Sequence, residues 1–201
     1  MSEPRIALTF DTEHWGHPTT PDVQDRILDL LERRGVRATF FLQGRWAQAY
    51  PKCAARIAAG GHLVGNHSHH HAPMNLLTDD GIVQDVHAAE AAIRETAGAD
   101  PRPWFRCPFG AGHDDPRVLD ALARAGYRDH FWDVEPDDWR PERTVEQLER
   151  LVIDGALAHG DGAVVLLHSW PPVTPLALPR ILDELPAAGC RFVRLDEVRP
   201  A

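Results

Sequence analysis

Four of the twelve histidines of this 201-residue sequence lie between His67 and His71, and this run is its most unusual chemical feature. His67 and His71 are four residues apart, so on a helical turn both imidazoles would lie on one side and could bind a single cation. His69 and His70 would point elsewhere. The alternative is a surface histidine run with only incidental affinity for metals, and a third ligand would decide between the two. Imidazole pairs suit zinc, cobalt or nickel, and catalytic zinc sites add a further ligand while leaving one position open for water.

The segment Thr9–Glu13 can supply a carboxylate as that third ligand. Successive side chains of a strand alternate between its two faces, so Asp11 and Glu13 would lie on the same side. One of them could bind the cation while the other served as a general base.

Short β-rich runs alternate with helical patterns from end to end, which is typical of an α/β fold with a mainly parallel sheet. Seven runs are predicted strands, a number typical of a barrel: Arg5–Phe10, Ala38–Leu42, His62–Gly65, Trp104–Arg106, Tyr127–Trp132, Ala163–His168 and Arg191–Leu195. The predicted helices are Val23–Arg34, Cys53–Ala59, Asp79–Thr96, Pro116–Ala125, Val145–His159 and Leu178–Ala188. Two helix starts carry capping signals, because Asp115 precedes a first-turn proline and Thr144 forms a capping box with Gln147.

Four polar residues, Asp11, His67, Arg106 and His168, each fall at or just after the end of a predicted strand. Each alone has an ordinary structural explanation. A strand-end aspartate can cap the next helix, an arginine can pair with a nearby carboxylate, and a histidine can form hydrogen bonds with the backbone of a turn. In a barrel of parallel strands, however, the loops at the carboxyl ends of the strands build the active site. Their convergence on that face therefore favours a catalytic site.

Composition limits the other possibilities. The chain has 43% apolar and 25% charged residues, as expected for one globular domain over residues 1–201. Its 21 Lys and Arg against 30 Asp and Glu give a net charge of −9, which disfavours nucleic acid and anionic membranes as partners. The three cysteines are far apart and suggest neither disulfides nor a cysteine zinc site. The apolar stretch near the N-terminus is only about six residues long, too short for a signal peptide, so we expect a cytoplasmic location.

Five short motifs, in order, resemble those of the polysaccharide deacetylases with a NodB homology domain, carbohydrate esterase family 4. The resemblance covers roughly residues 5 to 196. The motifs are Thr9-Phe10-Asp11, His67-Ser68-His69-His70-His71 for H-[ST]-x-x-H, Arg106-Cys107-Pro108-Phe109-Gly110 for R-x-P-[YF]-G, Glu135-Pro136-Asp137-Asp138-Trp139 for D-x-x-D-W, and Leu166-Leu167-His168 for L-x-H. The fourth departs from the family pattern, because it has a glutamate in its first position.

The resemblance implies a distorted (β/α)7-type barrel, with its active site at the carboxyl ends of the strands, that hydrolyses the N-acetyl group of an amino sugar with a divalent metal. On that basis Asp11 is expected to be the general base and Arg106 the group that holds it in place. His67 and His71 are expected to bind the metal. The backbone N–H of Phe109 is expected to stabilise the oxyanion.

We expect Asp11 and His168 to act on opposite sides of the scissile amide, because they fall at the ends of well-separated predicted strands on one face. The resemblance implies that His168 protonates the departing amine. It also implies that Asp138 keeps the His168 imidazole oriented and protonated, and that Trp139 lines the sugar pocket. Trp15 and Trp170 lie on the catalytic face by position, where we expect them to contact substrate. Trp104 and Trp132 fall within predicted strands, where packing in the core is the simpler expectation.

One departure concerns the metal ligands. In the family a second aspartate usually follows the base directly and binds the metal, whereas here Thr12 follows Asp11 and Glu13 comes next. A threonine hydroxyl is a poor ligand for a divalent ion, so we favour Glu13. The other possibility is that Asp11 itself binds the metal and the base is lost or replaced. Cys107 is disfavoured as a nucleophile because no histidine and asparagine pair is marked out for it.

These observations leave three candidate functions for the protein. The leading one is a metal-dependent deacetylase of N-acetylated sugars or oligosaccharides, with zinc as the default ion and cobalt or nickel as alternatives. The second is an amide hydrolase acting on a substrate that is not a sugar, such as a ureide. The third is a non-catalytic protein that binds sugar or metal, suggested by Thr12; the presence of Asp11 and His168 argues against it, since a binding module needs no acid and base.

Overall fold

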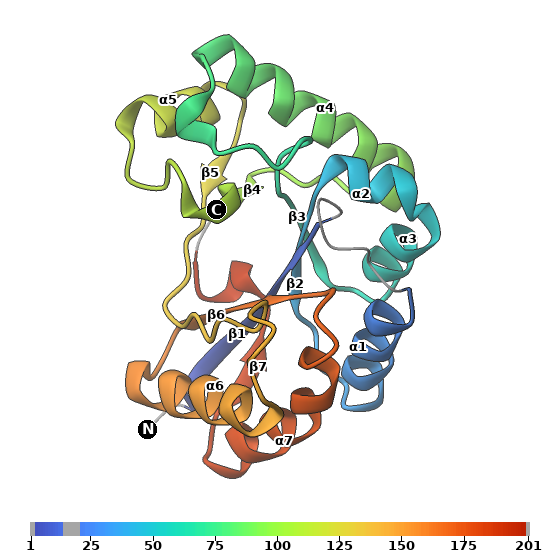
Figure 1. Cartoon of the computed structure of the whole chain (residues 1–201), viewed down its shortest axis with the longest axis vertical. Helices are drawn as coiled ribbons and strands as arrows, with labels where there is room; N and C mark the ends of the chain where they lie inside the picture. The colour runs from blue at the N-terminus through green and yellow to red at the C-terminus, as the bar shows by residue number, and fades with distance from the viewer. Residues whose placement is uncertain (1–2, 14–20, 200–201) are drawn as a thin grey trace.

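The structure, a computed structural model, describes residues 3–13 and 21–199. All seven predicted strands are present and pair in parallel (Figure 1): β1 Arg5–Thr12, β2 Thr39–Leu42, β3 Leu63–Asn66, β4 Trp104–Phe105, β5 Arg128–Asp129, β6 Ala163–His168 and β7 Arg191–Val193. Their order is β5-β4-β3-β2-β1-β6, with β7 beside the first half of β1. The α/β fold with a parallel sheet is therefore confirmed.

The sheet curves into a partial barrel. In the part of the chain that the structure describes, no ladder joins β5 to β6. Instead Val134, in the connection that follows β5, forms a bridge with Val165 of β6, and the Leu166 N–H donates to the Val134 carbonyl at 2.9 Å. The barrel is thus closed by a loop rather than by a strand, as the term distorted barrel implies.

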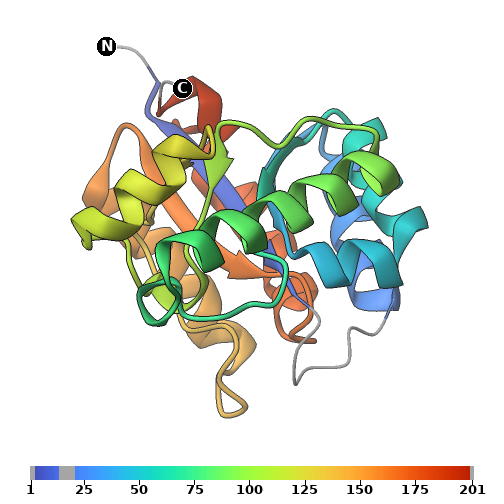
Figure 2. The same cartoon turned by 90° about the horizontal axis from the view of Figure 1, so that it is seen from above.

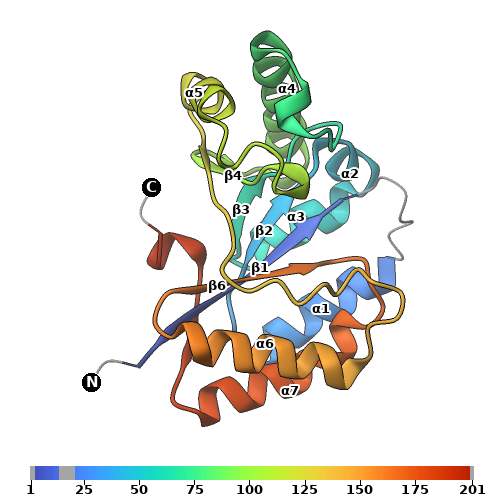
Figure 3. The ribbon, with the colours of Figure 1, turned by 60° about the vertical axis from the view of Figure 1, so that its left-hand side comes forward.

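Helices cover the outside of this sheet. They are α1 Pro21–Arg33, α2 Gly44–Ala49, α3 Pro51–Ala59, α4 Asp79–Ala97, α5 Pro116–Arg124, α6 Val145–His159 and α7 Thr174–Ala187. Three short 3-10 turns follow strands or loops, at Met74–Leu76, Pro108–Gly110 and Leu195–Glu197. Helices α4 and α5 cover one end of the curved sheet, near β3 to β5, and α6 and α7 cover the other, near β1 and β6 (Figures 2 and 3). None of the described helices has the length and apolar character needed to cross a bilayer.

The predicted helix boundaries are close to the observed ones, with two exceptions. Helix α2 was not predicted, because six residues are too few to show a helical period. Helix α7 begins at Thr174 rather than Leu178, since Pro175 fits the first turn of a helix, where its missing N–H costs nothing. Both capping signals are confirmed: Asp115 accepts from the Arg117 N–H, and Thr144 and Gln147 form a reciprocal capping box.

Alternation along β1 decides which side chains reach the site. Ile6, Leu8 and Phe10 belong to the core cluster shared with the helices, whereas Ala7 packs with Phe41 and Val164 inside the barrel. A period of two therefore places the side chains of residues 7, 9, 11 and 13 on the interior face. Thr12 belongs to the opposite face, toward the helices.

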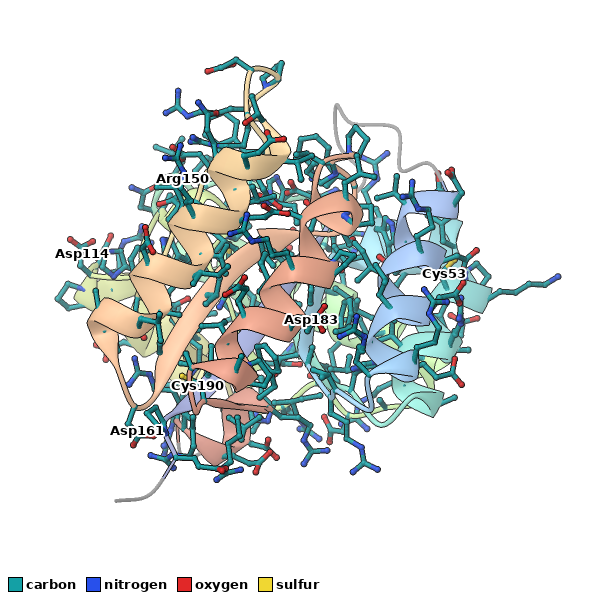
Figure 4. The ribbon with its side chains drawn as sticks, turned by 90° about the horizontal axis from the view of Figure 1, so that it is seen from below. Cys53, Asp114, Arg150, Asp161, Asp183 and Cys190 are labelled. Carbon is teal, nitrogen blue, oxygen red and sulfur yellow. The ribbon has the colours of Figure 1, made fainter. Side chains whose placement is uncertain are left out.

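The cysteines are all free, as the sequence predicts. Cys107 and Cys190 are buried and Cys53 is half-buried. Cys53, on α3, and Cys190, just after α7, lie far apart in the view of Figure 4, so this pair cannot form a disulfide.

Candidate active site

A pocket of about 630 Å³ opens at the carboxyl ends of β1, β3 and β6. Predicted site residues line it: Asp11, Glu13, His67, His71, Phe109, Trp139, His168 and Trp170. Arg106 and Asp138 are buried directly behind Asp11 and His168, to which they are hydrogen-bonded. Trp15 lies outside the described residues.

Glu13, His67 and His71 form the one group of potential metal ligands among the described residues, with ligand atoms that all lie within 4.8 Å of one another. His71 Nε2 contacts the Glu13 carboxylate, and His67 Nε2 is 4.0 Å from it. Two imidazoles and a carboxylate are a donor set that suits zinc, cobalt or nickel. Thr12 does not belong to this group, because strand alternation turns its side chain away.

The protonation states of this group also suit a cation. His67 Nδ1 lies 3.0 Å from the Arg106 carbonyl, which can only accept, so Nδ1 carries the proton and Nε2 presents its lone pair to the cluster. Burial lowers the pKa of His67 to about 4 despite the nearby Asp11 carboxylate, so the ring is neutral at pH 7. Burial would raise the pKa of Glu13, but the hydrogen bond with His71 and the charges of His168 and His71 hold it well below its usual range.

Glu13 is also oriented from its other side. Its Oε1 accepts a hydrogen bond of 2.9 Å from Trp170 Nε1, while its Oε2 faces the two imidazoles. A glutamate has one more rotatable bond than an aspartate, so this contact restricts a side chain that would otherwise be freer. Trp170 therefore lines the pocket, as predicted, and in addition positions Glu13.

The histidine run is not helical, so the prediction of a helical turn is wrong. Ser68 and His71 both have positive φ, 65° and 57°, which L residues adopt at a cost. The two imidazoles converge all the same, with ring centroids 5.0 Å apart. Side chains hold the turn in this shape: Asn66 Oδ1 accepts from the Ser68 N–H, and Ser68 Oγ accepts from the His71 N–H, each at 2.9 Å.

Asp85 on α4 is a support of this turn that sequence reasoning missed. Its two carboxylate oxygens accept from the N–H groups of His69 and His70 at 2.7 and 3.0 Å. Asp85 is buried, although it lies on an otherwise ordinary amphipathic helix. The signal available in the sequence was an acidic residue at a position of this helix where the helical period predicts an apolar one.

Asp11 is held by a buried arginine. Arg106, fully inaccessible to solvent, donates from Nη1 to Asp11 Oδ1 at 2.9 Å and to Thr9 Oγ1 at 2.8 Å. Its guanidinium lies 4.2 Å from the centre of the Phe41 ring inside the barrel. The other carboxylate oxygen, Oδ2, faces the pocket 3.5 Å from His67 Nε2. The pairing neutralises the arginine and leaves one oxygen of Asp11 directed at the ligand cluster.

His168, at the end of β6, is paired with Asp138. Asp138 Oδ1 is 2.7 Å from His168 Nδ1, and Oδ2 accepts from the His168 N–H and from Thr174 Oγ1 at 2.8 and 2.7 Å. Burial would lower the pKa of His168, but Asp138, with further contributions from Glu13 and Asp11, raises it to about 9. The imidazole is therefore protonated at pH 7, with Nε2 free of Asp138 and facing the pocket.

Asp11 and His168 do not lie on well-separated strands, as the spacing along the chain suggested. Strands β1 and β6 are neighbours, and Asp11 is directly opposite His168 in their register. Paired residues of adjacent parallel strands project to the same face, so both groups enter the pocket side by side. The prediction that they share the carboxyl-end face is confirmed, whereas the predicted separation is wrong.

Phe109 and Trp139 are exposed at the rim. Phe109 has 67% of its surface exposed, a left-handed backbone with φ 59° and ψ 11°, and a ring 4.5 Å from that of His71. Trp139 is 40% exposed, with the Arg140 guanidinium 4.9 Å from its ring. Exposed aromatic rings at a pocket mouth are available to an apolar ligand face.

Three further expectations concern Cys107, Trp104 and Trp132. Cys107 is buried and its burial raises the pKa of its thiol, which excludes a thiolate nucleophile near neutral pH, as expected. Trp104 is in the core, also as expected, whereas Trp132 is only half-buried and packs against the interior core cluster. Strand β5 ends at Asp129, so Trp132 lies in the connection beyond it and lines the pocket.

A curved parallel sheet with a cluster of metal ligands at the carboxyl ends of its strands is the architecture of a metal-dependent hydrolase. The family model described as polysaccharide deacetylase matches residues 1–130, and the chain belongs to that family. The resemblance found in the five motifs is thereby confirmed.

Three relatives illustrate the range of this family. The chain is 28% identical to the peptidoglycan-N-acetylmuramic acid deacetylase PdaA of Bacillus subtilis, covering 98% of this chain and 72% of that protein. It is 28% identical to a chitooligosaccharide deacetylase of Azorhizobium caulinodans, covering 89% and 80%. A crystal structure of a Bacillus anthracis protein described as a CE4 family pseudoenzyme matches with a TM-score of 0.86 and 27% identity, covering 98% and 65%. The family therefore includes both enzymes and at least one protein described as inactive.

Proposed function

We propose that this protein is a metal-dependent deacetylase that hydrolyses the N-acetyl groups of amino sugars or oligosaccharides. One observation carries the proposal: a single pocket holds the Glu13, His67 and His71 cluster between two charged pairs, Asp11 with Arg106 and His168 with Asp138. Amide hydrolysis needs a base to activate water and an acid to protonate the amine, and the two pairs fit these tasks.

Asp11 acts as the base. Oδ1 is occupied by Arg106, while Oδ2 faces the pocket beside the ligand cluster. Oδ2 takes a proton from the water that attacks the acetyl carbon, and Arg106 keeps the carboxylate in the orientation that this transfer requires.

His168 acts as the acid. Asp138 accepts from Nδ1, so the proton on Nε2 is the one directed into the pocket. That proton passes to the nitrogen of the scissile amide as the C–N bond breaks, releasing acetate and a free amine. The backbone N–H of Phe109, at the mouth of the pocket, contributes a hydrogen bond to the oxygen on which negative charge develops.

Glu13, His67 and His71 would hold the divalent ion, with zinc as our default. Such an ion supplies Lewis-acid stabilisation of the negative charge that develops during attack on the amide carbonyl. The ionised Glu13 and the neutral His67 have the protonation states that ligands need before any cation arrives.

The alternatives make different predictions. A non-catalytic protein, like the pseudoenzyme among the structural neighbours, would bind metal or sugar without turnover, and the presence of both proton-transfer pairs disfavours it. A ureide hydrolase would act on small amides but not on saccharides. The cytoplasmic location expected from the sequence stays a prediction.

The test is release of acetate from N-acetylated chitooligosaccharides by metal-stripped protein before and after addition of zinc, cobalt or nickel. We expect release only after metal is restored, and none from an Asp11→Asn variant that still binds the metal. Release that is equal with and without metal would contradict the proposal. Turnover of ureides without turnover of any saccharide would favour the second function.

A further inference from the structure

The pocket also contains a row of stacked rings. His113 lies against Phe131 and Phe131 against Trp132, with centroids 3.9 Å apart in both cases and interplanar angles of 21° and 20°. All three line the pocket. Because the rings cover one another's faces, the row presents mainly ring edges, and these give this part of the pocket a mostly apolar lining.

Glu135 ends this row. It occupies the first position of the fourth motif, where many relatives carry aspartate, and no step of the proposed reaction uses it. Glu135 lines the pocket, and its Oε2 accepts a hydrogen bond of 3.0 Å from Trp132 Nε1. Glu135 is exposed and forms no ion pair with another described residue, so its carboxylate is open to a ligand cation.

The carboxylates that line the pocket therefore differ in how their charge is balanced. At the reactive end, Arg106 and His168 offset the carboxylates of Asp11 and Glu13. Glu135 has no such ion pair among the described residues, although the Arg106 guanidinium lies 5.7 Å from the ring of its hydrogen-bond partner, Trp132. At the rim, the Arg140 guanidinium lies 4.9 Å from the centre of the Trp139 ring and is paired with Asp137 at 3.0 Å.

A carboxylate in a pocket lined by aromatic rings favours an ammonium group over a neutral or anionic one. The carboxylate offers direct charge attraction to the ammonium and repels an anion. Amino sugars offer all three kinds of ligand: glucosamine carries an ammonium near neutral pH, N-acetylglucosamine is neutral, and N-acetylmuramic acid carries a lactyl carboxylate.

We infer that Glu135 and the stacked row form a subsite for an ammonium-bearing amino sugar that neighbours the unit being deacetylated. The inference rests on the proposed function and narrows its substrate to glycans that already contain free amines. A glucosamine unit binds there with its ammonium at Glu135 and its ring against Trp132. A muramic acid unit is repelled by the same carboxylate.

The experiment compares kcat/KM for acetate release from three oligosaccharides of equal length at low ionic strength. One is fully N-acetylated, one has a glucosamine unit beside the reacting sugar, and one has an N-acetylmuramic acid unit there. We expect the glucosamine substrate to exceed the neutral one by about three- to tenfold and the muramic acid substrate to fall below it. Added salt should reduce both differences, because it screens exposed charges.

Variants of Glu135 then test whether this side chain causes the differences in kcat/KM between the three substrates. Glu135→Gln should bring the ratio of glucosamine to neutral substrate close to one, and Glu135→Lys should invert the preference toward the muramic acid substrate. The matched control is Glu142→Gln, which removes an exposed carboxylate that lies outside the pocket and should keep the wild-type ratio. A wild-type ratio near one, or a ratio that Glu135→Gln leaves intact, would overturn the inference while leaving the deacetylase function standing. Absence of acetate release from all three substrates would instead reject the proposed function itself.

Discussion

The two sides of the pocket reach their geometry by different means. On one side, His67 and His71 lie on an irregular turn with two left-handed residues. This turn depends on hydrogen bonds that the side chains of Asn66, Ser68 and Asp85 accept from its backbone N–H groups. On the other side, His168 is the last residue of the regular strand β6, already fixed by its ladder to β1.

The supporting residues therefore control different properties on the two sides: the position of the metal ligands on one side and the protonation state of His168 on the other. The histidine turn needs outside support to hold its ligands in place, so damage to that support should change metal affinity. His168 needs no such support for its backbone, and Asp138 mainly sets its protonation and ring orientation. Damage on that side should change proton transfer while the metal stays bound.

The largest effect is expected on the metal side. His67→Ala removes a buried ligand, so we expect loss of stoichiometric zinc and acetate release near background, measured by metal analysis and turnover. His70→Ala is the matched control, because His70 is outside the ligand group, and it should retain both. The reverse pattern would show that the assignment of ligands within the motif is wrong.

On the acid side, His168→Ala should keep its zinc and still lose on the order of 10²- to 10⁴-fold in kcat, because a general acid contributes about that much. Metal content and kcat measured on the same preparation separate the two sides. If this variant lost its metal in proportion to its activity, the proposed division between the sides would fail.

A smaller effect on metal affinity is expected from Asp85→Asn. The variant replaces one of two carboxylate oxygens with an amide nitrogen, which cannot accept from the His69 or His70 N–H groups. Supports behind a metal ligand are typically worth about 10- to 100-fold in metal affinity, so the zinc dissociation constant should rise by that factor. Asp80→Asn, on the same helix but partly exposed, is the control, and equal constants for Asp85→Asn and wild type would remove Asp85 from the account.

The smallest change is a shift in pH dependence. His168 works as an acid only when protonated, and its pKa of about 9 predicts that kcat/KM declines above that pH. Asp138→Asn removes the charge that raises this pKa, so the alkaline limb should move to lower pH by about one to three units. A pH profile with an unmoved alkaline limb would show that another group is the acid.

Much of the fold could be predicted because its signals are local. Alternating strand and helix patterns, the Asp115 and Thr144 caps and the five motifs each depend on a few adjacent residues. The same holds for Asp11 and Glu13, whose common face follows from a period of two in any strand.

What the sequence did not reveal depends on contacts between distant residues. Asp85 reaches the histidine turn only because α4 packs over β3, and Trp170 reaches Glu13 only because β6 pairs with β1. The neighbouring positions of Asp11 and His168 follow from strand order, which periodicity does not report. The left-handed turn at Ser68 and His71 is a strained conformation that local propensity does not predict.

The central claim is that Glu13, and neither Thr12 nor Asp11, completes a metal site with His67 and His71. The most direct test is a crystal structure of zinc-loaded protein with an anomalous difference map at the zinc edge. We predict one peak within about 2.0–2.2 Å of a Glu13 carboxylate oxygen and the Nε2 atoms of His67 and His71, with Asp11 kept on Arg106. A peak bound to the Asp11 carboxylate, with Glu13 turned away, would contradict the account and leave the reaction without its proposed base.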